Sequence, residues 1–383
     1  MFDKLTGEDL RLLVKRVFQP RDTDRGLLIM VDLPDERLGD NPHWQARRRL
    51  AAGWAEALAG ECEALGLDRL TLVWFRNAGG NNADLPATAV PGEGGWLPES
   101  ADELDGRTSV PFTELFAEHS MVLAPTELSA TAPLKVATRN GDFRAATMPG
   151  FLDSMIPALR LDYGEINRRV NLLKDLCDAS EQCVITTETP LGRHELVLDL
   201  RHRFGHASGG LFPDNGVAGN LPSGEAYIVP YEGEIESDTS RTAGQLPVQL
   251  GDQLALLTIE GNRVREVQGE GDLVAAERDH FEREPAYRNL AELGLGVLGD
   301  FGLQPTGSIL LDEKLGLHIA FGRSDHFGGV VGPADFSSPD AVIHLDRVYI
   351  QETQPDVKVL EVRLEGPEGA MTIMLDGHFT ALF

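Results

Sequence analysis

Hydrophobic positions in the first half of the chain form short runs, separated by stretches with a helical period. Five runs rich in aliphatic and β-branched residues predict strands: LLIMVDL from Leu27, LTLVWF from Leu70, MVLAPTEL from Met121, FRAATMPG from Phe143 and CVITTET from Cys183. Between the first two, PHWQARRRLAAGWAEALAGECEALG predicts an amphipathic helix ended by Gly66. Between the last two, FLDSMIPALRLDYGEINRRVNLLKDLCDAS predicts one or two helices. This alternation is typical of a mostly parallel sheet covered by helices.

From about residue 195 the pattern changes to short alternating strands separated by glycine-rich turns such as GEGD and EGNR. This pattern predicts an antiparallel, β-rich domain. One interruption, AERDHFEREPAYRNLAELG, has a helical period and is expected to end at Gly294. A chain of 383 residues also exceeds what one hydrophobic core usually supports. We therefore expect an α/β domain over residues 1–190 and an α+β, β-rich domain over residues 191–383.

The charge balance narrows the classes of partner. The chain has 34 Lys and Arg residues against 61 Asp and Glu residues, a net charge of −27. Such a chain repels phosphate backbones and anionic lipid, so we expect neither nucleic acid nor a membrane as its partner. The first residues, MFDKLTGEDLRLLVKRVF, lack the basic and then apolar layout of a secretory signal. We expect a cytoplasmic protein that acts on a small peptide or another small molecule.

Common nucleotide-binding motifs are missing from the sequence. No G-x-G-x-x-G stands at a turn from strand to helix, and no Walker lysine motif occurs. Dehydrogenase and kinase chemistry therefore have no support in the sequence.

The sharpest candidate for chemistry is the triplet His344-Leu345-Asp346 inside the apolar run AVIHLDRVYI. Residues two apart on a strand project from the same face, so the imidazole and the carboxylate are expected to point the same way. One nitrogen and one oxygen donor suit a metal ion. The same pattern also fits a surface histidine beside an aspartate that pairs with Arg347 or Arg323.

Further acids and histidines stand in segments with small or apolar neighbours. His318 lies in LLDEKLGLHIAFGRSDHFGG, where it fits a metal ligand or a core histidine. Glu225 opens the strand EAYIVP, where a buried carboxylate requires a cation. Glu292 ends the predicted helix and opens ELGLGVLGD. Each acid alone also fits a solvated turn or a charge at a helix end. His326, in SDHFGG, fits a support for a ligand or a surface residue.

Taken in order, four segments resemble those of the thermophilic aminopeptidase T family of metallopeptidases, which are leucyl aminopeptidase-like. They are NLPSGEAYIVP, AELGLGVLGD, DEKLGLHIAFGRS and HLD. The resemblance is clearest from about residue 120 to 350 and includes TRNGDFRAATMPGF. It implies an α/β N-terminal domain, a β-rich metal-binding C-terminal domain and a homodimer. It also implies a set of metal ligands: Glu225, Glu292, His318, His344 and Asp346.

One departure from the family concerns catalysis. The family has a tyrosine seven residues after the histidine of its H-I-A segment, where this chain has Asp325 followed by His326. A neutral hydrogen-bond donor is therefore missing, and a protonated His326 is the expected replacement. Glu313, in DEK, is a further candidate as a supporting acid or proton carrier, and it also fits a surface charge.

The resemblance implies an enzyme, an aminopeptidase that removes N-terminal residues with a metal-activated water and two divalent ions such as Zn²⁺, Co²⁺ or Mn²⁺. A rival function stays open, because His318, His344 and Asp346 also satisfy the two-histidine, one-carboxylate pattern of non-haem Fe(II). A ring-opening 2,5-dihydroxypyridine dioxygenase resembles the same family, but it places a histidine where this chain has Glu292. The acids at 225 and 292 favour hydrolysis, and the missing tyrosine favours other chemistry. A non-catalytic metal-binding or ligand-binding protein is the third alternative.

Overall fold

The computed structural model describes residues 4–383, which divide into two compact units. The first unit contains the residues up to Asn167, together with Ser208–Ser223 and Thr306–Leu311. The second unit contains Arg168–Ala207, Gly224–Pro305 and Asp312–Phe383. Two later segments thus return to the unit that the first part of the chain builds.

The first unit is built on a seven-stranded sheet with the order β10-β6-β5-β1-β2-β3-β4. Its strands from β10 to β2 run parallel, and β3 and β4 add antiparallel pairs at one edge. The strands are β1 (Gly26–Leu33), β2 (Arg69–Arg76), β3 (Thr88–Pro91), β4 (Val110–Pro111), β5 (Met121–Ala124), β6 (Arg144–Thr147) and β10 (Ala218–Asn220). The helices are α1 (Gly7–Phe18), α2 (Pro42–Ala59), α3 (Cys62–Leu65), α4 (Phe112–Glu118), α5 (Thr131–Asn140) and α6 (Ile156–Leu159).

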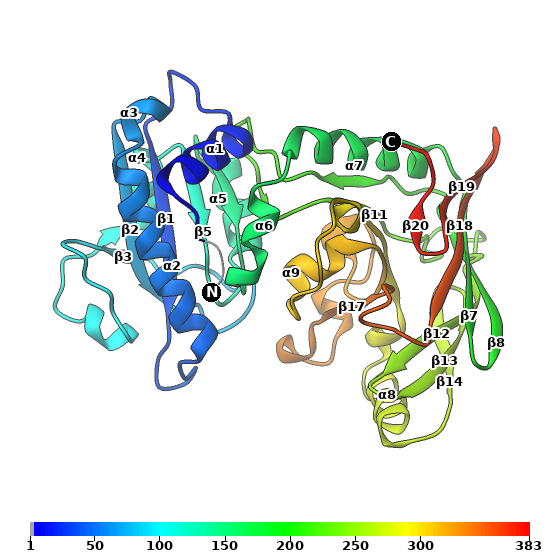
Figure 1. The fold of residues 1–383 in the computed structure, drawn as a ribbon. Coiled ribbons are helices and arrows are strands. Elements are labelled where there is room, and N and C mark those ends of the chain that lie inside the picture. Colours follow the sequence, from blue (N-terminus) through cyan, green and yellow to red (C-terminus); the bar gives the residue numbers. More distant parts are fainter. Residues whose placement is uncertain (1–3) are drawn as a thin grey trace. The chain divides into compact units, whose positions relative to one another are not determined.

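Local sequence explains the main elements of this unit. Every residue of β1 is buried, as its apolar run LLIMVDL requires of a central parallel strand. Thr6 begins α1 with a capping box to Asp9, and Asn41 caps α2 by accepting from the N–H of Trp44. Figure 1 shows α1 and α2 beside β1.

A buried ion pair between Arg144 and Asp24 connects β6 to the rest of the first unit. Arg144 donates to both carboxylate oxygens of Asp24, at 2.8 Å and 2.7 Å, and the two side chains are 0% and 1% exposed. Arg144 also donates to the carbonyl of Phe18, at 2.9 Å. The guanidinium thus connects α1, the following loop and β6.

The second unit contains an antiparallel eight-stranded sheet with the order β14-β13-β12-β8-β7-β18-β19-β20. The strands are β7 (Gln182–Thr189), β8 (Gly192–Asp199), β12 (Ala243–Leu250), β13 (Gln253–Glu260), β14 (Arg263–Gln268), β18 (Lys358–Gly366), β19 (Gly369–Leu375) and β20 (His378–Phe379). The helix α8 (Asp272–Arg283) follows β14 in the chain, and Figure 1 shows it beside the β12–β14 strands. The long helix α7 (Tyr163–Asp178) leads from the first unit into the second.

A smaller five-stranded sheet in the second unit has the order β17-β16-β15-β11-β9. Its strands are β9 (His206–Ser208), β11 (Glu225–Ile228), β15 (Leu290–Gly296), β16 (Leu317–Gly322) and β17 (His344–Val348). The pairs from β11 to β17 are antiparallel. A short helix, α9 (Ile309–Asp312), and a 3₁₀ turn over Glu313–Leu315 precede β16. All the predicted metal ligands lie on this sheet.

The parallel sheet of the first unit and the antiparallel sheets of the second confirm the expected fold class in outline. Three expected elements were wrong in detail. The CVITTET strand is β7, which forms a hairpin with β8 in the antiparallel sheet rather than a strand of the parallel one. The predicted helix ending at Gly66 is divided into α2 and α3, although Gly66 does end α3 with a positive φ.

The third error concerns the helix that was expected to reach Gly294. Instead α8 ends at Arg283, because Glu284 precedes a proline and is extended. After a 3₁₀ turn over Pro285–Arg288, the chain enters β15. Glu292 is therefore a residue within a strand rather than at the end of a helix.

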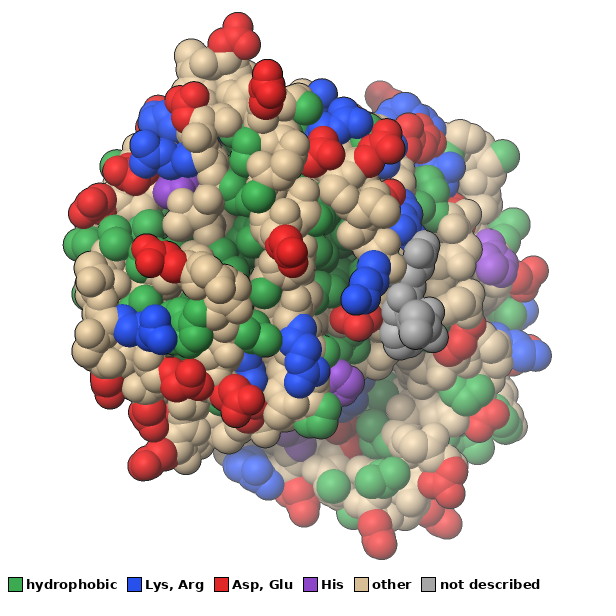
Figure 2. Space-filling model, turned by 60° about the vertical axis from the view of Figure 1, so that its left-hand side comes forward, with side chains coloured by type: hydrophobic (Ala, Val, Ile, Leu, Met, Phe, Trp, Pro, Cys, Tyr) green, Lys and Arg blue, Asp and Glu red, His purple; other side chains and the backbone are tan. Residues whose placement is uncertain are grey.

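Charged side chains are spread over the surface. On the face in Figure 2, acidic side chains are scattered among Lys and Arg side chains rather than gathered into one patch. In the part of the chain that the structure describes, no helix combines the length and the apolar character needed to cross a membrane.

Candidate metal centre

The five-stranded sheet brings all five predicted ligands to one of its faces. Residues paired across an antiparallel ladder project from the same face, as do residues two apart along a strand. The register pairs Glu225 with Gly296, Gly294 with His318, Glu292 with Ala320, Ala320 with Asp346, and Gly322 with His344. All five side chains thus project from the same face of the sheet. They are Glu225 on β11, Glu292 on β15, His318 on β16, and His344 and Asp346 on β17.

Small residues between the ligands leave room for them. A Cβ atom built on Gly294 would lie 1.9 Å from the Nε2 atom of His318. One on Gly296 would lie 2.2 Å from the backbone carbonyl carbon of Lys314. The glycines of the E-L-G-L-G segment therefore provide the space in which the imidazole and the turn before β16 lie.

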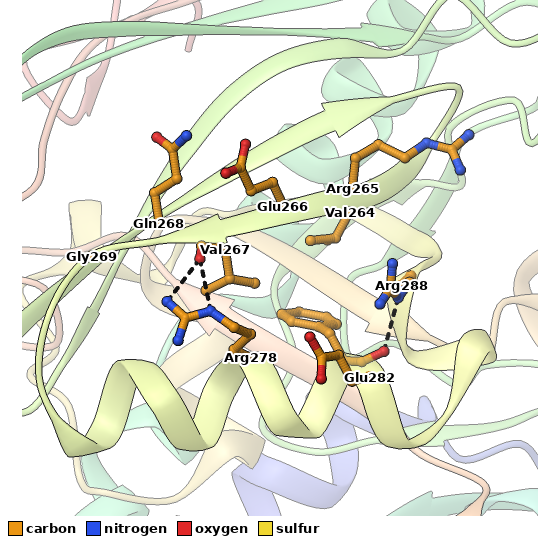
Figure 3. A pocket seen from close by; sticks show the side chains of 10 residues that line it. Val264, Arg265, Glu266, Val267, Gln268, Gly269, Arg278, Glu282 and Arg288 are labelled. Carbon is orange, nitrogen blue, oxygen red and sulfur yellow. Dashed lines mark hydrogen bonds between the residues drawn. The ribbon is translucent and has the colours of Figure 1, made fainter.

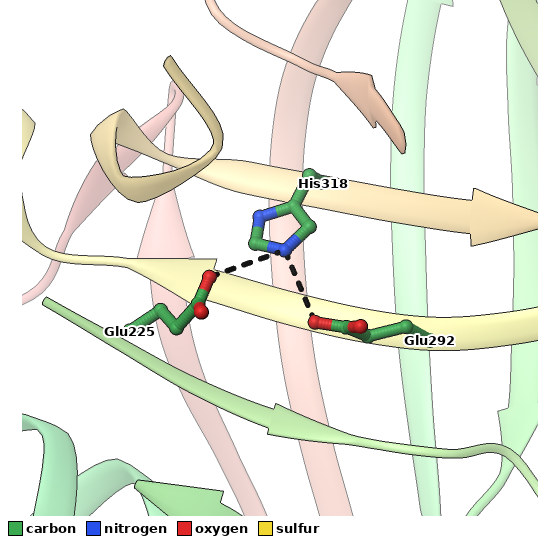
Figure 4. Close-up of side chains that lie close together, drawn as sticks. All are labelled: Glu225, Glu292 and His318. Atoms are coloured by element: carbon green, nitrogen blue, oxygen red, sulfur yellow. Dashed lines mark hydrogen bonds and ion pairs between the residues drawn. The ribbon is translucent and has the colours of Figure 1, made fainter. Parts of the chain in front are cut away.

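The polar atoms of the cluster approach one another closely. The Nε2 atom of His318 lies 3.3 Å from Oε1 of Glu292 and 3.5 Å from Oε2 of Glu225, and Figure 4 shows both carboxylates turned toward the imidazole. The other oxygen of Glu292, Oε2, lies 3.1 Å from Nε2 of His344. That nitrogen also lies 3.5 Å from Oδ1 of Asp346. Glu292 thus lies between the two histidines and faces each with a different oxygen.

These spacings fit a metal ion. Two ligand atoms that are each about 2.1 Å from an ion and about 90–110° apart are separated by about 3.0–3.4 Å. The observed nitrogen to oxygen distances of 3.1–3.5 Å are close to that range. Two groups of three ligand atoms each lie within 4.8 Å: Glu225, Glu292 and His318 in one, and Glu292, His344 and Asp346 in the other. In the first group the buried Oε2 atom of Glu225 has no hydrogen-bond partner, which leaves it available to a cation.

Both histidines are also oriented as metal ligands commonly are. The Nδ1 atom of His344 lies 2.8 Å from the carbonyl oxygen of Arg323, and that of His318 lies 3.4 Å from the carbonyl oxygen of Gly316. A backbone carbonyl holds the proton on Nδ1 and leaves Nε2 as the donor to a metal. In each ring it is Nε2 that faces the carboxylates.

The electrostatics of the cluster favour cations. Burial alone would lower the pKa of His318, but the carboxylates of Glu292 and Glu225 outweigh it and raise that pKa to about 9. Burial likewise opposes the ionisation of Glu292, yet the two imidazoles hold the pKa of its carboxyl well below the usual range. The protons on these imidazoles therefore compensate negative charge, which a divalent ion can take over.

Two residues just before β16 complete the cluster. The Nζ atom of Lys314 lies 2.5 Å from Oε1 of Glu225 and also forms an ion pair with Glu313. Lys314 is 1% exposed and Glu313 is 15% exposed. Burial raises the pKa of Glu313 to about 8, despite the ammonium beside it. Glu313, predicted as a supporting acid, thus lies beside the ligand groups rather than on the open surface.

The residues at the position of the family's tyrosine lie at the rim of the cluster. Asp325 accepts from Nε of Arg323 at 2.6 Å, and the ring of His326 lies 5.3 Å from that of His344. Burial, with His344 adding to it, lowers the pKa of His326 to about 4. With this pKa the ring of His326 is neutral near neutral pH and has one N–H to donate, which disfavours the protonated form expected from the sequence.

Sequence reasoning missed two residues that lie beside the candidate metal cluster. Lys314 follows Glu313 directly in the sequence, and nothing in the local pattern singled it out. Its 2.5 Å contact with Glu225 in the structure shows that it belongs beside the ligand groups. Tyr227 lies two residues after Glu225 on the same face of β11, with its ring 4.7 Å from that of Phe327. The period of two along the strand was the available signal for Tyr227.

A separate hollow of about 460 Å³ lies between β14 and α8 (Figure 3). Three arginines and two glutamates line it, but Arg278 already donates to the carbonyl of Val267 and Arg288 to that of Phe281. No member of the metal cluster is among its lining residues. This hollow thus lies apart from the candidate metal cluster.

The fold agrees with the resemblance seen in the motifs. Neither a protein-family model nor a curated protein sequence matches the chain. Two solved structures are similar over 98% of this chain and 98% of their own: 2,5-dihydroxypyridine dioxygenase from Pseudomonas putida, with a TM-score of 0.61 and 14% identity, and AmpT from Thermus thermophilus, with a TM-score of 0.57 and 15% identity. The chain therefore has the fold shared by AmpT and this dioxygenase, and at such identities the likeness concerns the fold alone.

Proposed function

We propose that this chain is a metal-dependent hydrolase, an aminopeptidase that removes N-terminal residues from peptides. The observation that carries the proposal is the position of Glu292, which faces His318 with one carboxylate oxygen and His344 with the other. Glu225 and Asp346 complete the two ligand groups around it. Three carboxylates and two imidazoles suit divalent ions such as Zn²⁺, Co²⁺ or Mn²⁺, and the two groups offer up to two positions.

A bound divalent ion would lower the pKa of a coordinated water and polarise the substrate carbonyl. The chain itself must move the proton. Glu313 suits that task by its position, because its carboxyl lies beside the ligand groups and is partly exposed. In this proposal its free oxygen takes a proton from the attacking water and returns it to the departing amine.

His326 is the proposed donor to the substrate carbonyl in place of the family's tyrosine. Its side chain is 33% exposed and its neutral ring keeps one N–H. Asp325 is an unsuitable donor because it is a carboxylate paired with Arg323. The surplus of carboxylates in the cluster would favour the positively charged amino terminus of a peptide.

A ring-opening Fe(II) dioxygenase acting on a hydroxylated pyridine is the second candidate. The similarity to 2,5-dihydroxypyridine dioxygenase favours it, as does the missing tyrosine. His318, His344 and Asp346 supply the two nitrogens and one oxygen that such chemistry uses. We rank hydrolysis first because this chain has the acids Glu225 and Glu292.

Two parallel assays on the metal-stripped protein separate these candidates. Release of anilide from amino-acid anilides is followed with added Zn²⁺, Co²⁺ or Mn²⁺, and oxygen uptake on dihydroxypyridines is followed with Fe(II). We expect metal-dependent anilide release without oxygen uptake. Fe(II)-dependent oxygen uptake would replace the hydrolase with the dioxygenase, and turnover in neither assay would favour a non-catalytic metal-binding protein. A cytoplasmic homodimer stays a prediction.

A further inference from the structure

Lys314 is a cation that belongs to the metal cluster itself. It lies in the 3₁₀ turn before β16, and its side chain is 1% exposed. Its ammonium contacts the carboxylates of Glu225 and Glu313. A buried ammonium is costly without such partners, so these acids hold it in place.

The two ligand groups are unequal because of this lysine. In the group of Glu225, Glu292 and His318, one oxygen of Glu225 is already bonded to the ammonium at 2.5 Å. In the group of Glu292, His344 and Asp346, no described Lys or Arg side chain forms an ion pair with a member. A fixed positive charge beside the first group repels a divalent ion there and partly neutralises the acid that would bind it.

We propose that Lys314 stands in for one of the two ions, so that the chain binds one divalent ion tightly through Glu292, His344 and Asp346, while the group containing Glu225 and His318 fills at least 100-fold more weakly. The proposal rests on the proposed metal dependence, but it holds for either reaction. Lys314 is a positioning residue here, because it acts on the ion through Glu225.

Metal titration of the chelator-treated, full-length protein tests the proposal. Equilibrium dialysis against Mn²⁺, with the metal counted by mass spectrometry, gives the number and affinity of bound ions without any assay of activity. We expect one tight equivalent for the wild type. Lys314→Met, which removes the charge and keeps much of the side-chain volume, is expected to strengthen the second equivalent at least tenfold. Lys358→Met, at an exposed lysine of β18, is the control and should match the wild type.

A second variant covers the case in which Lys314→Met fails to fold. Glu225→Gln is expected to keep the tight equivalent, because Glu225 is not among its ligands. Loss of that equivalent would place the tight ion in the group beside Lys314 and overturn the proposal. So would two wild-type equivalents of similar affinity, or a second equivalent unchanged in Lys314→Met. A wild type that binds no Mn²⁺, Co²⁺, Zn²⁺ or Fe²⁺ would instead overturn the proposed function.

Discussion

The imidazole of His318 lies over the Cα atom of Gly294, its partner across the β15–β16 ladder. A methyl group on that Cα would meet the Nε2 atom at 1.9 Å, and this is the atom that faces the carboxylates of Glu225 and Glu292. The glycine is therefore part of the candidate metal site although it has no side chain.

Gly294→Ala is expected to displace the His318 ring and to weaken metal binding at the group of Glu225 and His318. Displacing buried groups in this way also destabilises a core by about 1–3 kcal/mol. Metal titration together with thermal denaturation measures both effects. Gly53→Ala is the control, because a Cβ there meets nothing within 4 Å and alanine favours the α2 helix. Because that group is expected to bind the weaker, second equivalent, an unchanged affinity for the second equivalent in Gly294→Ala would separate His318 from the site.

His344→Ala and Asp346→Ala are expected to abolish metal-dependent activity while the fold survives. Loss of a group that merely supports a ligand costs roughly 10–100-fold in metal affinity, and loss of a ligand should exceed that. Metal content and circular dichroism of the purified variants test this, with the exposed His378→Ala as the control. Full activity in both variants would remove His344 and Asp346 from the site.

Asp325→Tyr restores the phenol of the related family at its expected position. Because Asp325 pairs with Arg323 and is not in either ligand group, the variant should keep its metal. We expect its rate of anilide release to rise, since the phenol would add a second neutral donor beside His326 at the substrate carbonyl. Metal content and anilide assays check this together, and loss of the metal would identify Asp325 as a ligand.

Much of the site followed from local pattern. The period of two in a strand was enough to place His344 and Asp346 on one face of β17. Glu292 was misplaced because a helical period precedes it, and the stop at Glu284 depends on the proline that follows. Lys314 approaches an acid 89 positions away, which follows from the register of the sheet and not from the lysine's neighbours in the sequence.

The fold, like the site, could be predicted from the sequence only in part. The apolar run of β1 predicted a buried parallel strand, and the structure confirms it. The run of β7 looked similar, but its hairpin with β8 determines that it joins the antiparallel sheet. Strand patterns reveal burial, whereas the choice of neighbour depends on residues elsewhere in the chain.

The ion pair of Asp24 and Arg144 makes the stability of the first unit depend on pH. Burial opposes ionisation of Asp24, but hydrogen bonds from Arg144 outweigh it and lower the pKa of the carboxyl. A lowered pKa stabilises the fold above the unfolded value of about 3.9, and this stability is lost as the pH falls through the folded pKa. Thermal denaturation of the wild type between pH 3 and 7 should show this loss.

Arg144→Met leaves the buried carboxylate unpaired and is expected to cost about 3–5 kcal/mol at pH 7. The cost should shrink on acidification, because a protonated Asp24 no longer needs a cation. Arg69→Met removes an exposed pair with Glu118 and serves as the control, with an expected cost of about 0–1 kcal/mol. An equal cost of Arg144→Met at pH 3 and pH 7 would show that the charge of Asp24 is not involved.

The central claim is that the cluster on the five-stranded sheet holds a divalent ion. Anomalous diffraction from crystals soaked in Mn²⁺ tests it most directly. The account predicts a strong anomalous peak about 2.1–2.3 Å from Glu292, His344 and Asp346, since Mn²⁺ takes oxygen and nitrogen ligands. A cluster without a peak, while the carboxylates and imidazoles remain bonded to one another, would contradict it.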